Sequence, residues 1–210
     1  MERERWVFAF SVDGDLRFIS HRDTLRLFKR ALARASLPVR YTEGFNPHPR
    51  LSIPLPRPVG VSSQAEAIVV EFERPINGDE VLGKLDHQAP AGIEMTSARR
   101  LAPREQLQPA LVRYRLDLGD TPGAEVEPRV RQILGAGVLP IKRVNLKDGQ
   151  MRSIDVRPFL EDMHADGDTV EFTLRVTGTG TVKPAEIAEL LGYDVDSINH
   201  RIRRVEVQWR

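Results

Sequence analysis

Residues 20 to 35 read SHRDTLRLFKRALARA, and this stretch carries the clearest structural signal in the chain. Ser20 is a good N-cap, and Asp23 stands three residues later, close to the capping-box pattern. Apolar residues then recur at spacings of three and four, namely Leu25, Phe28, Leu32 and Ala35. Pro38 cannot continue a helix. The stretch therefore predicts an amphipathic helix that starts at Ser20 and runs through Ala35.

The opposite face of this predicted helix is basic. It carries Arg22, Arg26, Lys29, Arg30 and Arg34, and Asp23 is the one acidic residue among them. Such a row can contact successive phosphates of a nucleic acid and release counterions on binding. An ordinary solvated helix face also carries charge, but it usually has more acidic residues for intrahelical pairs. The shortage of such partners favours a surface that binds a polyanion.

The segments around this helix predict an α+β domain. Strands are expected at residues 6–12, 39–42, 65–73 and 93–101, with an extended proline-rich segment at 51–61 and a second helix at 79–88. This order is β-α-β-β-α-β, the ferredoxin-like arrangement. We expect the first domain to span residues 1–103.

After an expected linker at residues 102–109, the same order of elements recurs. We expect strands at 112–118, 169–177 and 202–208, helices at 125–134 and 183–191, and a hairpin that pairs 141–146 with 151–156 across Lys147-Asp148-Gly149. The sequence thus predicts two tandem ferredoxin-like domains, the second covering residues 110–210.

A second candidate binding element is the loop from Glu43 to Ser52, EGFNPHPRLS. Pro47 and Pro49 hold the backbone extended, and Gly44 permits unusual dihedral angles. The loop carries Phe45, Asn46, His48 and Arg50, which together can stack on, hydrogen-bond and neutralise an unpaired nucleotide. Alternatively, Phe45 fills the core and the prolines brace a crossover.

Two histidines are candidates for acid-base chemistry, because imidazole is the usual group for RNA cleavage. His21 stands at the first position of the predicted helix, and His48 lies in the loop. Each is also consistent with a structural, hydrogen-bonded histidine. Neither has the spacing of a metal site, so we expect neither a metal nor another cofactor.

Two further segments have weaker signals. Residues 177 to 184, TGTGTVKP, place glycines before a helix and could cradle a phosphate, but they lack the Walker and Gly-x-Gly-x-x-Gly spacings. A flexible strand-to-helix turn is the preferred interpretation. Near the C-terminus a basic cluster could extend the basic surface: His200, Arg201, Arg203, Arg204 and Arg210.

Composition narrows the class of protein. The 210 residues include no cysteine, which excludes disulfides and Cys-ligated metal clusters on this chain. The formal net charge is only +1, but Arg17 to Arg57 holds nine basic and two acidic residues, a local charge of +7. The N-terminal segment lacks the apolar core of a secretory signal, and the apolar runs of the chain, among them Trp6 to Phe10 and Ala67 to Val70, are too short to span a membrane. We expect a cytoplasmic protein without a membrane partner.

The chain closely resembles the bacterial radical-SAM-linked domain of unknown function in residues 16–23 (LRFISHRD) and 43–52 (EGFNPHPRLS), and in Leu55-Pro56 and Val59-Gly60-Val61. Residues 154–158 (IDVRP) and 179–184 also look like that family. Members of that family are fused behind a radical-SAM module or encoded beside one, often near a ribonuclease of the E/G type. The resemblance implies an accessory domain that presents RNA to a modifying or processing enzyme. Without cysteine the chain would be the stand-alone form, and Arg22 departs from the aliphatic residue usual in the family.

A more distant likeness is to the tandem ferredoxin-like endoribonucleases that process CRISPR transcripts. Those enzymes combine a basic helix, a general acid-base histidine and a glycine-rich loop, which His21 and Gly178-Thr179-Gly180 would imitate. This likeness exists at the level of the fold, and a fold does not determine a function.

Together these features predict an RNA-binding accessory protein that works with a radical-SAM enzyme on tRNA or rRNA. One alternative is a metal-independent endoribonuclease that uses His21 or His48 to activate a ribose 2′-hydroxyl. Another is a protein-interaction module whose basic face docks an acidic enzyme partner.

Overall fold

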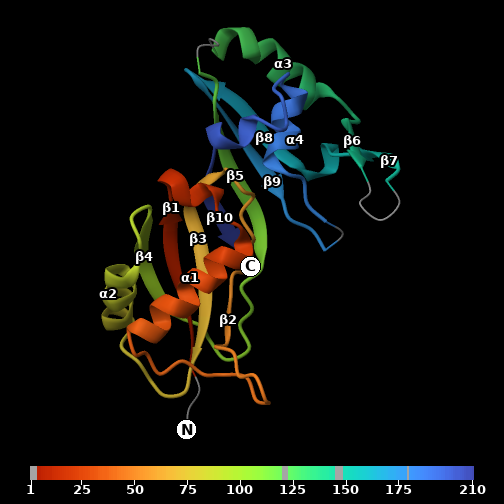
Figure 1. Ribbon diagram of the computed structural model, residues 1–210. Helices are drawn as coiled ribbons and strands as arrows, with labels where there is room; N and C mark the ends of the chain where they lie inside the picture. The colour runs from red at the N-terminus through yellow and green to blue at the C-terminus, as the bar shows by residue number, and fades with distance from the viewer. Residues whose placement is uncertain (1–3, 120–122, 145–148, 179) are drawn as a thin grey trace. The chain divides into compact units, whose positions relative to one another are not determined.

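Figure 1 shows a computed structural model of the chain, which describes residues 4–119, 123–144, 149–178 and 180–210. The protein belongs to the α+β class. The chain divides into two compact units, one formed by residues 1–109 with 209–210 and the other by residues 110–208.

The sheet of the first unit is built on β1 (Glu4–Val12), which lies between β4 (Ile93–Arg100) and β3 (Ser62–Phe72). Both neighbours run antiparallel to β1, with Phe8 opposite Ile68 on one side and Ala98 on the other. The two-residue strand β2 (Leu51–Ser52) pairs antiparallel with Val69 and Val70 of β3. The strands expected at 6–12, 65–73 and 93–101 are confirmed, with ends that shift by a few residues.

The segment between the first helix and β3 forms less sheet than the sequence predicts. The strand expected at 39–42 is reduced to isolated bridges, Val39 with Phe72 and Tyr41 with Pro49. Within the extended segment 51–61, only β2 joins the ladder. The prolines at 54, 56 and 58 provide no N–H donor, so the segment cannot continue the ladder with β3.

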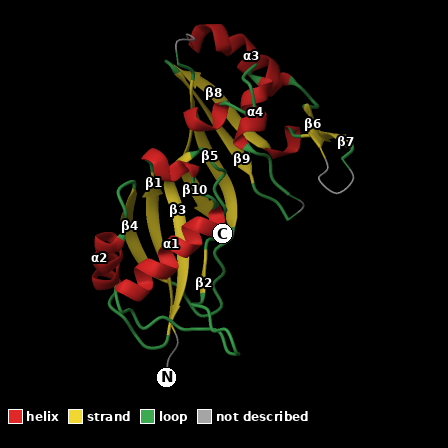
Figure 2. Cartoon of the chain, viewed as in Figure 1, coloured by secondary structure: helices red, strands yellow, loops and turns green. Residues whose placement is uncertain are grey.

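Both helices of the first unit pack on the same face of its strands (Figure 2). Helix α1 (His21–Arg34) begins at Ser20, whose hydroxyl accepts the Asp23 N–H, as predicted. It buries Phe28 and Leu32, as predicted, and also Thr24 and Ala31. Helix α2 (Gly78–Gln88) is capped by the Asn77 side chain.

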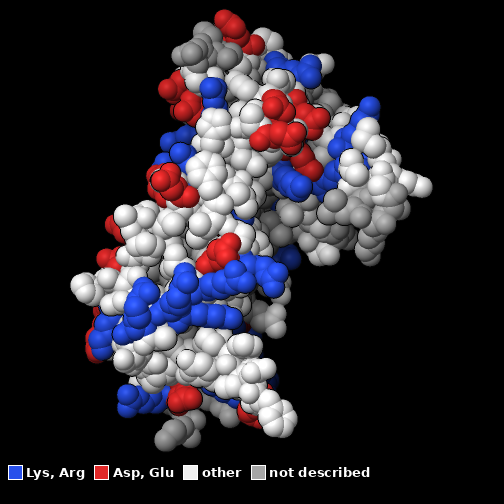
Figure 3. Space-filling model, in the orientation of Figure 1, with Lys and Arg blue, Asp and Glu red and all other residues white. Residues whose placement is uncertain are grey.

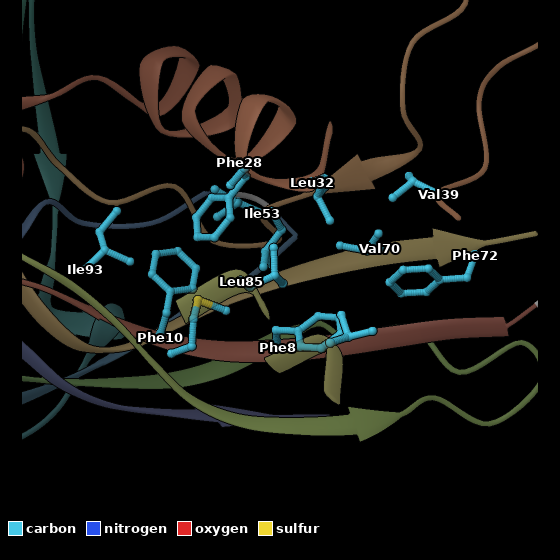
Figure 4. Close-up of a cluster of buried hydrophobic side chains, with 14 of the residues drawn as sticks. Phe8, Phe10, Phe28, Leu32, Val39, Ile53, Val70, Phe72, Leu85 and Ile93 are labelled. Carbon is cyan, nitrogen blue, oxygen red and sulfur yellow. The ribbon is translucent and has the colours of Figure 1, made fainter. Parts of the chain in front are cut away.

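The core of this unit is rich in aromatic rings (Figure 4). Phe8 and Phe10 of β1 are fully buried, and Phe10 meets Phe28 of α1 edge to face, with ring centroids 4.7 Å apart. Phe72 of β3 packs against Phe8. Because each of these rings removes a large apolar area from water, they fix the position of α1 over the sheet.

The second unit has a sheet in the order β10-β5-β9-β8. Its strands are β5 (Pro109–Asp117), β8 (Leu160–Asp166), β9 (Thr169–Arg175) and β10 (Ile202–Trp209), and its helices are α3 (Gly123–Gly135) and α4 (Pro184–Leu190). Strands β5 and β8 both pair antiparallel with β9, and the Tyr114 and Phe172 rings stack across the β5–β9 pair.

The middle of this unit differs from the expectation. The hairpin of β6 (Pro140–Val144) and β7 (Met151–Asp155) does form, but it is a separate two-stranded sheet. Lys147 and Asp148 of its expected turn lie outside the described residues. The strand that joins the main sheet is β8, which the sequence pattern did not predict. A register shift between Leu160 and Asp162 breaks the alternation of apolar residues, so that the buried side chains are Leu160 and Met163.

Candidate nucleic-acid interface

Helix α1 carries a row of exposed cations. Arg22, Arg26, Arg30 and Arg34 are all exposed, and each lies four residues after the last. Residues at this spacing are neighbours on a helix surface, and the row extends over about 18 Å at about 1.5 Å per residue. Lys29 is half-buried beside them. In Figure 3 a continuous band of basic side chains follows the line of α1.

Few carboxylates offset this row. Arg26 donates to Asp23 Oδ1 at 2.9 Å. This contact, together with the Ser20 hydroxyl, which contributes most, holds the pKa of Asp23 below its ordinary value. Arg34 instead donates to neutral groups at the end of α2, the Gln88 Oε1 at 2.9 Å and the Gln88 carbonyl at 3.0 Å.

The remaining cations of α1 are Arg22, Lys29 and Arg30, and none of them has a hydrogen-bond or ion-pair partner among the described residues. The row thus keeps most of its positive charge. It can donate several N–H groups to an anion without first breaking an ion pair.

The loop predicted to bind a nucleotide forms a projecting hairpin from Arg40 to Arg50. Thr42 N–H donates to the His48 carbonyl at 2.8 Å, His48 N–H to the Thr42 hydroxyl at 2.9 Å, and Arg50 N–H to the Arg40 carbonyl at 2.8 Å. Gly44 has φ 121°, a conformation that favours glycine. Phe45 at the tip is fully exposed, at 108% of its reference area. The alternative that Phe45 fills the core is therefore wrong.

The base of this hairpin is close to neutral. Glu71 of β3 lies 3.3 Å from Arg40 and 3.8 Å from Arg50, and Glu43 lies 3.9 Å from Arg40. The expected contribution of Arg50 to a basic surface is thus partly cancelled by Glu71. The hairpin presents an aromatic ring with Asn46 and His48, which are also exposed, and it adds little net charge.

The structure does not place all the predicted residues in one cluster. The hairpin projects apart from the basic band of α1 (Figures 1 and 3). His21 is half-buried at the first turn of α1, whereas His48 is exposed in the hairpin, and no side-chain hydrogen bond links either imidazole to a described residue. The cations of α1 are gathered, but the two histidines are not paired with a carboxylate or with each other in the described structure.

One exposed aromatic residue beside α1 was not singled out from the sequence. Phe18 ends the 3-10 helix η1 (Gly14–Phe18), its residue is 52% exposed, and the Arg17 guanidinium lies 5.3 Å from its ring centroid. In the sequence, the position of Phe18 next to Arg17 and just before the Ser20 cap could have marked it as a candidate binding residue. An exposed ring beside a cation suits base stacking.

Arg57 is one of the nine basic residues between Arg17 and Arg57, but its role is structural. It is only 8% exposed, and it donates to the carbonyls of Arg17 at 2.7 Å, Leu16 at 3.2 Å and Pro58 at 3.3 Å, and to that of Val61. It therefore fixes η1, and with it Phe18, against the segment 57–61.

Within the C-terminal basic cluster, His200, Arg201 and Arg210 are exposed, whereas Arg204 is buried. Arg204 is 1% exposed, and its guanidinium lies 5.8 Å from the ring centroid of Tyr114. Arg201 donates to the Leu118 carbonyl at 3.4 Å. Arg204 cannot contribute to a binding surface, because it is packed inside the second unit.

The glycine-containing segment before α4 is a tight turn, in which Thr177 and Gly180 exchange backbone hydrogen bonds of 3.2 Å, while Thr179 lies outside the described residues. The first turn of α4 is already occupied by a carboxylate. Glu186 accepts the Lys183 N–H at 2.7 Å and a bidentate contact from Arg143, both oxygens at 2.6 Å. This arrangement fits the turn interpretation rather than a phosphate cradle.

The family described as "Uncharacterized protein conserved in bacteria (DUF2344)" matches residues 5–184. The chain belongs to this family. The matched range includes both α1 and the hairpin, so both features lie within the DUF2344 region.

No curated protein matches this DUF2344 chain. A solved structure titled "Crystal Structure of an Unknown Protein from Galdieria sulphuraria" is similar at 13% identity with a TM-score of 0.29, covering 100% of this chain and 99% of that one. None of the described helices is long and apolar enough to cross a membrane.

Proposed function

We propose that the chain is an RNA-binding accessory protein and that α1 holds the RNA backbone. The observation that carries this proposal is the row of four exposed arginines, with Lys29 beside it and Asp23 as the one acidic residue of α1. Guanidinium groups donate in a planar fork that suits phosphate oxygens. A row of this kind contacts the phosphate backbone of a nucleic acid, so its binding does not depend on the base sequence.

Two exposed rings could add stacking to this backbone contact. Phe45 stands at the tip of a hairpin stiffened by Pro47, Pro49 and cross-hairpin hydrogen bonds. Phe18 lies four residues before Arg22, the first cation of the row. Stacking of one base on an aromatic ring contributes about 1 to 3 kcal/mol and tolerates any base. We propose that Phe45, with Asn46, His48 and Arg50, contacts an unpaired nucleotide of a tRNA or rRNA.

We also propose a radical-SAM enzyme as the partner, on the basis of the sequence resemblance. The chain has no cysteine, so the residues that bind a cluster would come from the partner. In this arrangement the chain would supply the RNA-binding surface and the partner the chemistry.

The finer fold proposal is that both units are ferredoxin-like. The order of strands supports this proposal. It is β4-β1-β3-β2 in the first unit and β10-β5-β9-β8 in the second, so the corresponding strands of a β-α-β-β-α-β chain lie in the same spatial order in both units. In the second unit the β6–β7 hairpin is then an insertion between α3 and β8.

Filter binding of the purified chain to bulk tRNA and rRNA tests the RNA-binding proposal. The variant Arg22→Ala/Arg26→Ala/Arg30→Ala should lose most of its affinity, because it removes three of the exposed cations. A matched control, Lys84→Ala/Arg129→Ala/Arg131→Ala, removes three cations from α2 and α3 and should bind as the wild type does. Equal binding by all three proteins contradicts the proposal.

The purified chain and RNA also test the two alternative functions, an endoribonuclease and a protein-docking module. Cleavage of labelled RNA in EDTA that is lost in His21→Ala or His48→Ala would indicate an endoribonuclease. Retention of an acidic enzyme partner after ribonuclease treatment, with no RNA binding by the purified chain, would indicate a protein-docking module. We expect neither result.

A further inference from the structure

A cavity of about 610 Å³ lies in the first unit, away from the residues of α1 and the hairpin. It is formed by the start of β1, the end of β4 and the segment that follows β4. Its lining is unusually rich in arginine: Glu4, Arg5, Arg99, Arg100, Leu101, Ala102, Pro103, Arg104 and Glu105.

The two carboxylates of this cavity already have partners. Glu4 is 5% exposed and accepts the Trp6 indole N–H at 3.0 Å and the Ile76 N–H at 3.2 Å, and it lies 3.1 Å from Arg100. The Glu4 carboxylate therefore positions Arg100 and is not free to bind a cation.

Glu105 is satisfied in the same way. One oxygen accepts from Arg99 at 2.8 Å and the other accepts the Ala102 N–H at 2.8 Å. These two contacts, led by the one from Arg99, hold the pKa of Glu105 below its ordinary value, so the carboxylate stays charged and keeps Arg99 in place.

Among the described residues of the lining, the guanidinium groups outnumber the carboxylates, with four arginines against two glutamates. Arg5 is held by a hydrogen bond to the Glu105 carbonyl at 2.7 Å. Arg104 is exposed and has no hydrogen-bond or ion-pair partner among the residues that the structure describes. Its donors are available to a ligand.

The backbone at Arg104 is a second, independent sign of a binding role. Its φ is 67°, in the left-handed region, and the Glu105 N–H donates to the Ala102 carbonyl at 3.0 Å. Turns with Pro at the second position and a positive φ at the third normally place Gly or Asn there. An arginine in such a position is strained, and strained residues of this kind concentrate at ligand-binding sites.

We propose that this cavity binds a phosphate monoester dianion, with Arg104 as the principal donor and Arg99, Arg100 and Arg5 completing the positive wall. Guanidinium groups are in excess among the described lining residues, and their planar forks suit phosphate oxygens. The phosphate could belong to a small phosphorylated metabolite or to the end of an RNA. The proposal does not depend on α1, because none of the cavity residues lies in that helix.

Calorimetric titration of the full chain with inorganic phosphate and with adenosine monophosphate tests the site, with adenosine as the uncharged control. We expect both phosphates to bind and adenosine not to bind. RNA oligomers that carry a 5′-phosphate or a 5′-hydroxyl, titrated into Arg22→Ala/Arg26→Ala/Arg30→Ala, identify the source of the phosphate. A preference for the 5′-phosphate end over adenosine monophosphate indicates RNA, and the reverse indicates a small molecule.

The decisive variant is Arg104→Gly. Glycine adopts the positive φ without strain, so the melting temperature should rise, while phosphate affinity should fall at least tenfold. Arg104→Lys keeps the charge and should bind more tightly than Arg104→Gly. A purely structural turn would give the higher melting temperature with unchanged phosphate affinity, and that result overturns the proposal, as does the absence of phosphate binding by the wild type.

Discussion

The basic row of α1 leads to a quantitative prediction for Arg22→Ala/Arg30→Ala. These two arginines are exposed and have no partner among the described residues, so their removal leaves no carboxylate without its counterion. Arg26 and Arg34 are less suitable, because Arg26 pairs with Asp23 and Arg34 ties α1 to Gln88. The double variant should therefore change binding without changing the fold.

The magnitude follows from counterion release. Five cations and one carboxylate give α1 about four net contacts, and each contact to a single strand contributes about −0.7 to the slope of log K against log salt. The wild type should then show a slope of about −2.8, or about a 50-fold loss of affinity between 50 and 200 mM salt. The double variant should show a slope of about −1.4 and about a sevenfold loss over the same range.

Fluorescence anisotropy of a labelled, unstructured RNA at several salt concentrations measures these slopes. Lys84→Ala/Arg131→Ala is the matched control, since each of these residues is an exposed helical cation next to a glutamate four residues earlier. The control should keep the wild-type slope. If the slope of the α1 variant equals that of the control, α1 does not contact phosphates and the reasoning is refuted.

Four further outcomes can be checked. Phe28→Ala should lower the free energy of unfolding by about 3 to 5 kcal/mol in urea denaturation, because its buried ring packs on Phe10. Phe45→Ala should change stability by less than about 0.5 kcal/mol, since the ring is fully exposed, yet it should weaken binding to single-stranded RNA by about 1 to 3 kcal/mol; unchanged RNA affinity would count against the hairpin. Arg57→Ala should lower the free energy of unfolding by at least about 2 kcal/mol, because several backbone carbonyls lose their donor, and a neutral effect would show that water replaces the guanidinium. The pKa of Asp23 in the folded protein is lowered from 3.8, so the charged carboxylate stabilises the fold above pH 3.8, and this contribution is lost as the pH falls through the folded value. The urea midpoint of Asp23→Asn should therefore change less between pH 5 and pH 3 than that of the wild type.

Much of the local structure could be predicted from residue patterns. Helix α1 combines a Ser20 cap, a three-four apolar spacing and a following proline, and all three are local signals that agree with each other. The same holds for β1, where the buried residues Phe8, Phe10 and Val12 alternate along the strand, and for β3, which contains the buried apolar run Ala67 to Val70. Strand β8 could not be found in this way, because its register shift puts the buried residues Leu160 and Met163 three positions apart.

The candidate site was predicted in part. The arginines of α1 are exposed as expected, because a helix that buries Phe28 and Leu32 must turn its opposite face to solvent. The turn at Arg104 and the cavity beside it were not predicted. They depend on where β1 and β4 end and on which carboxylates meet Arg99 and Arg100.

The sequence alone therefore determines the periodic elements and the basic face of α1, since both follow from residue spacing along one segment. The tertiary structure alone decides which arginines are available. Arg57 and Arg204 are buried at 8% and 1% exposure, whereas Arg22 and Arg30 are exposed, although all four are the same residue type. The physical reason is that a guanidinium is available to a ligand only where no backbone carbonyl, aromatic ring or carboxylate from a distant segment has packed against it.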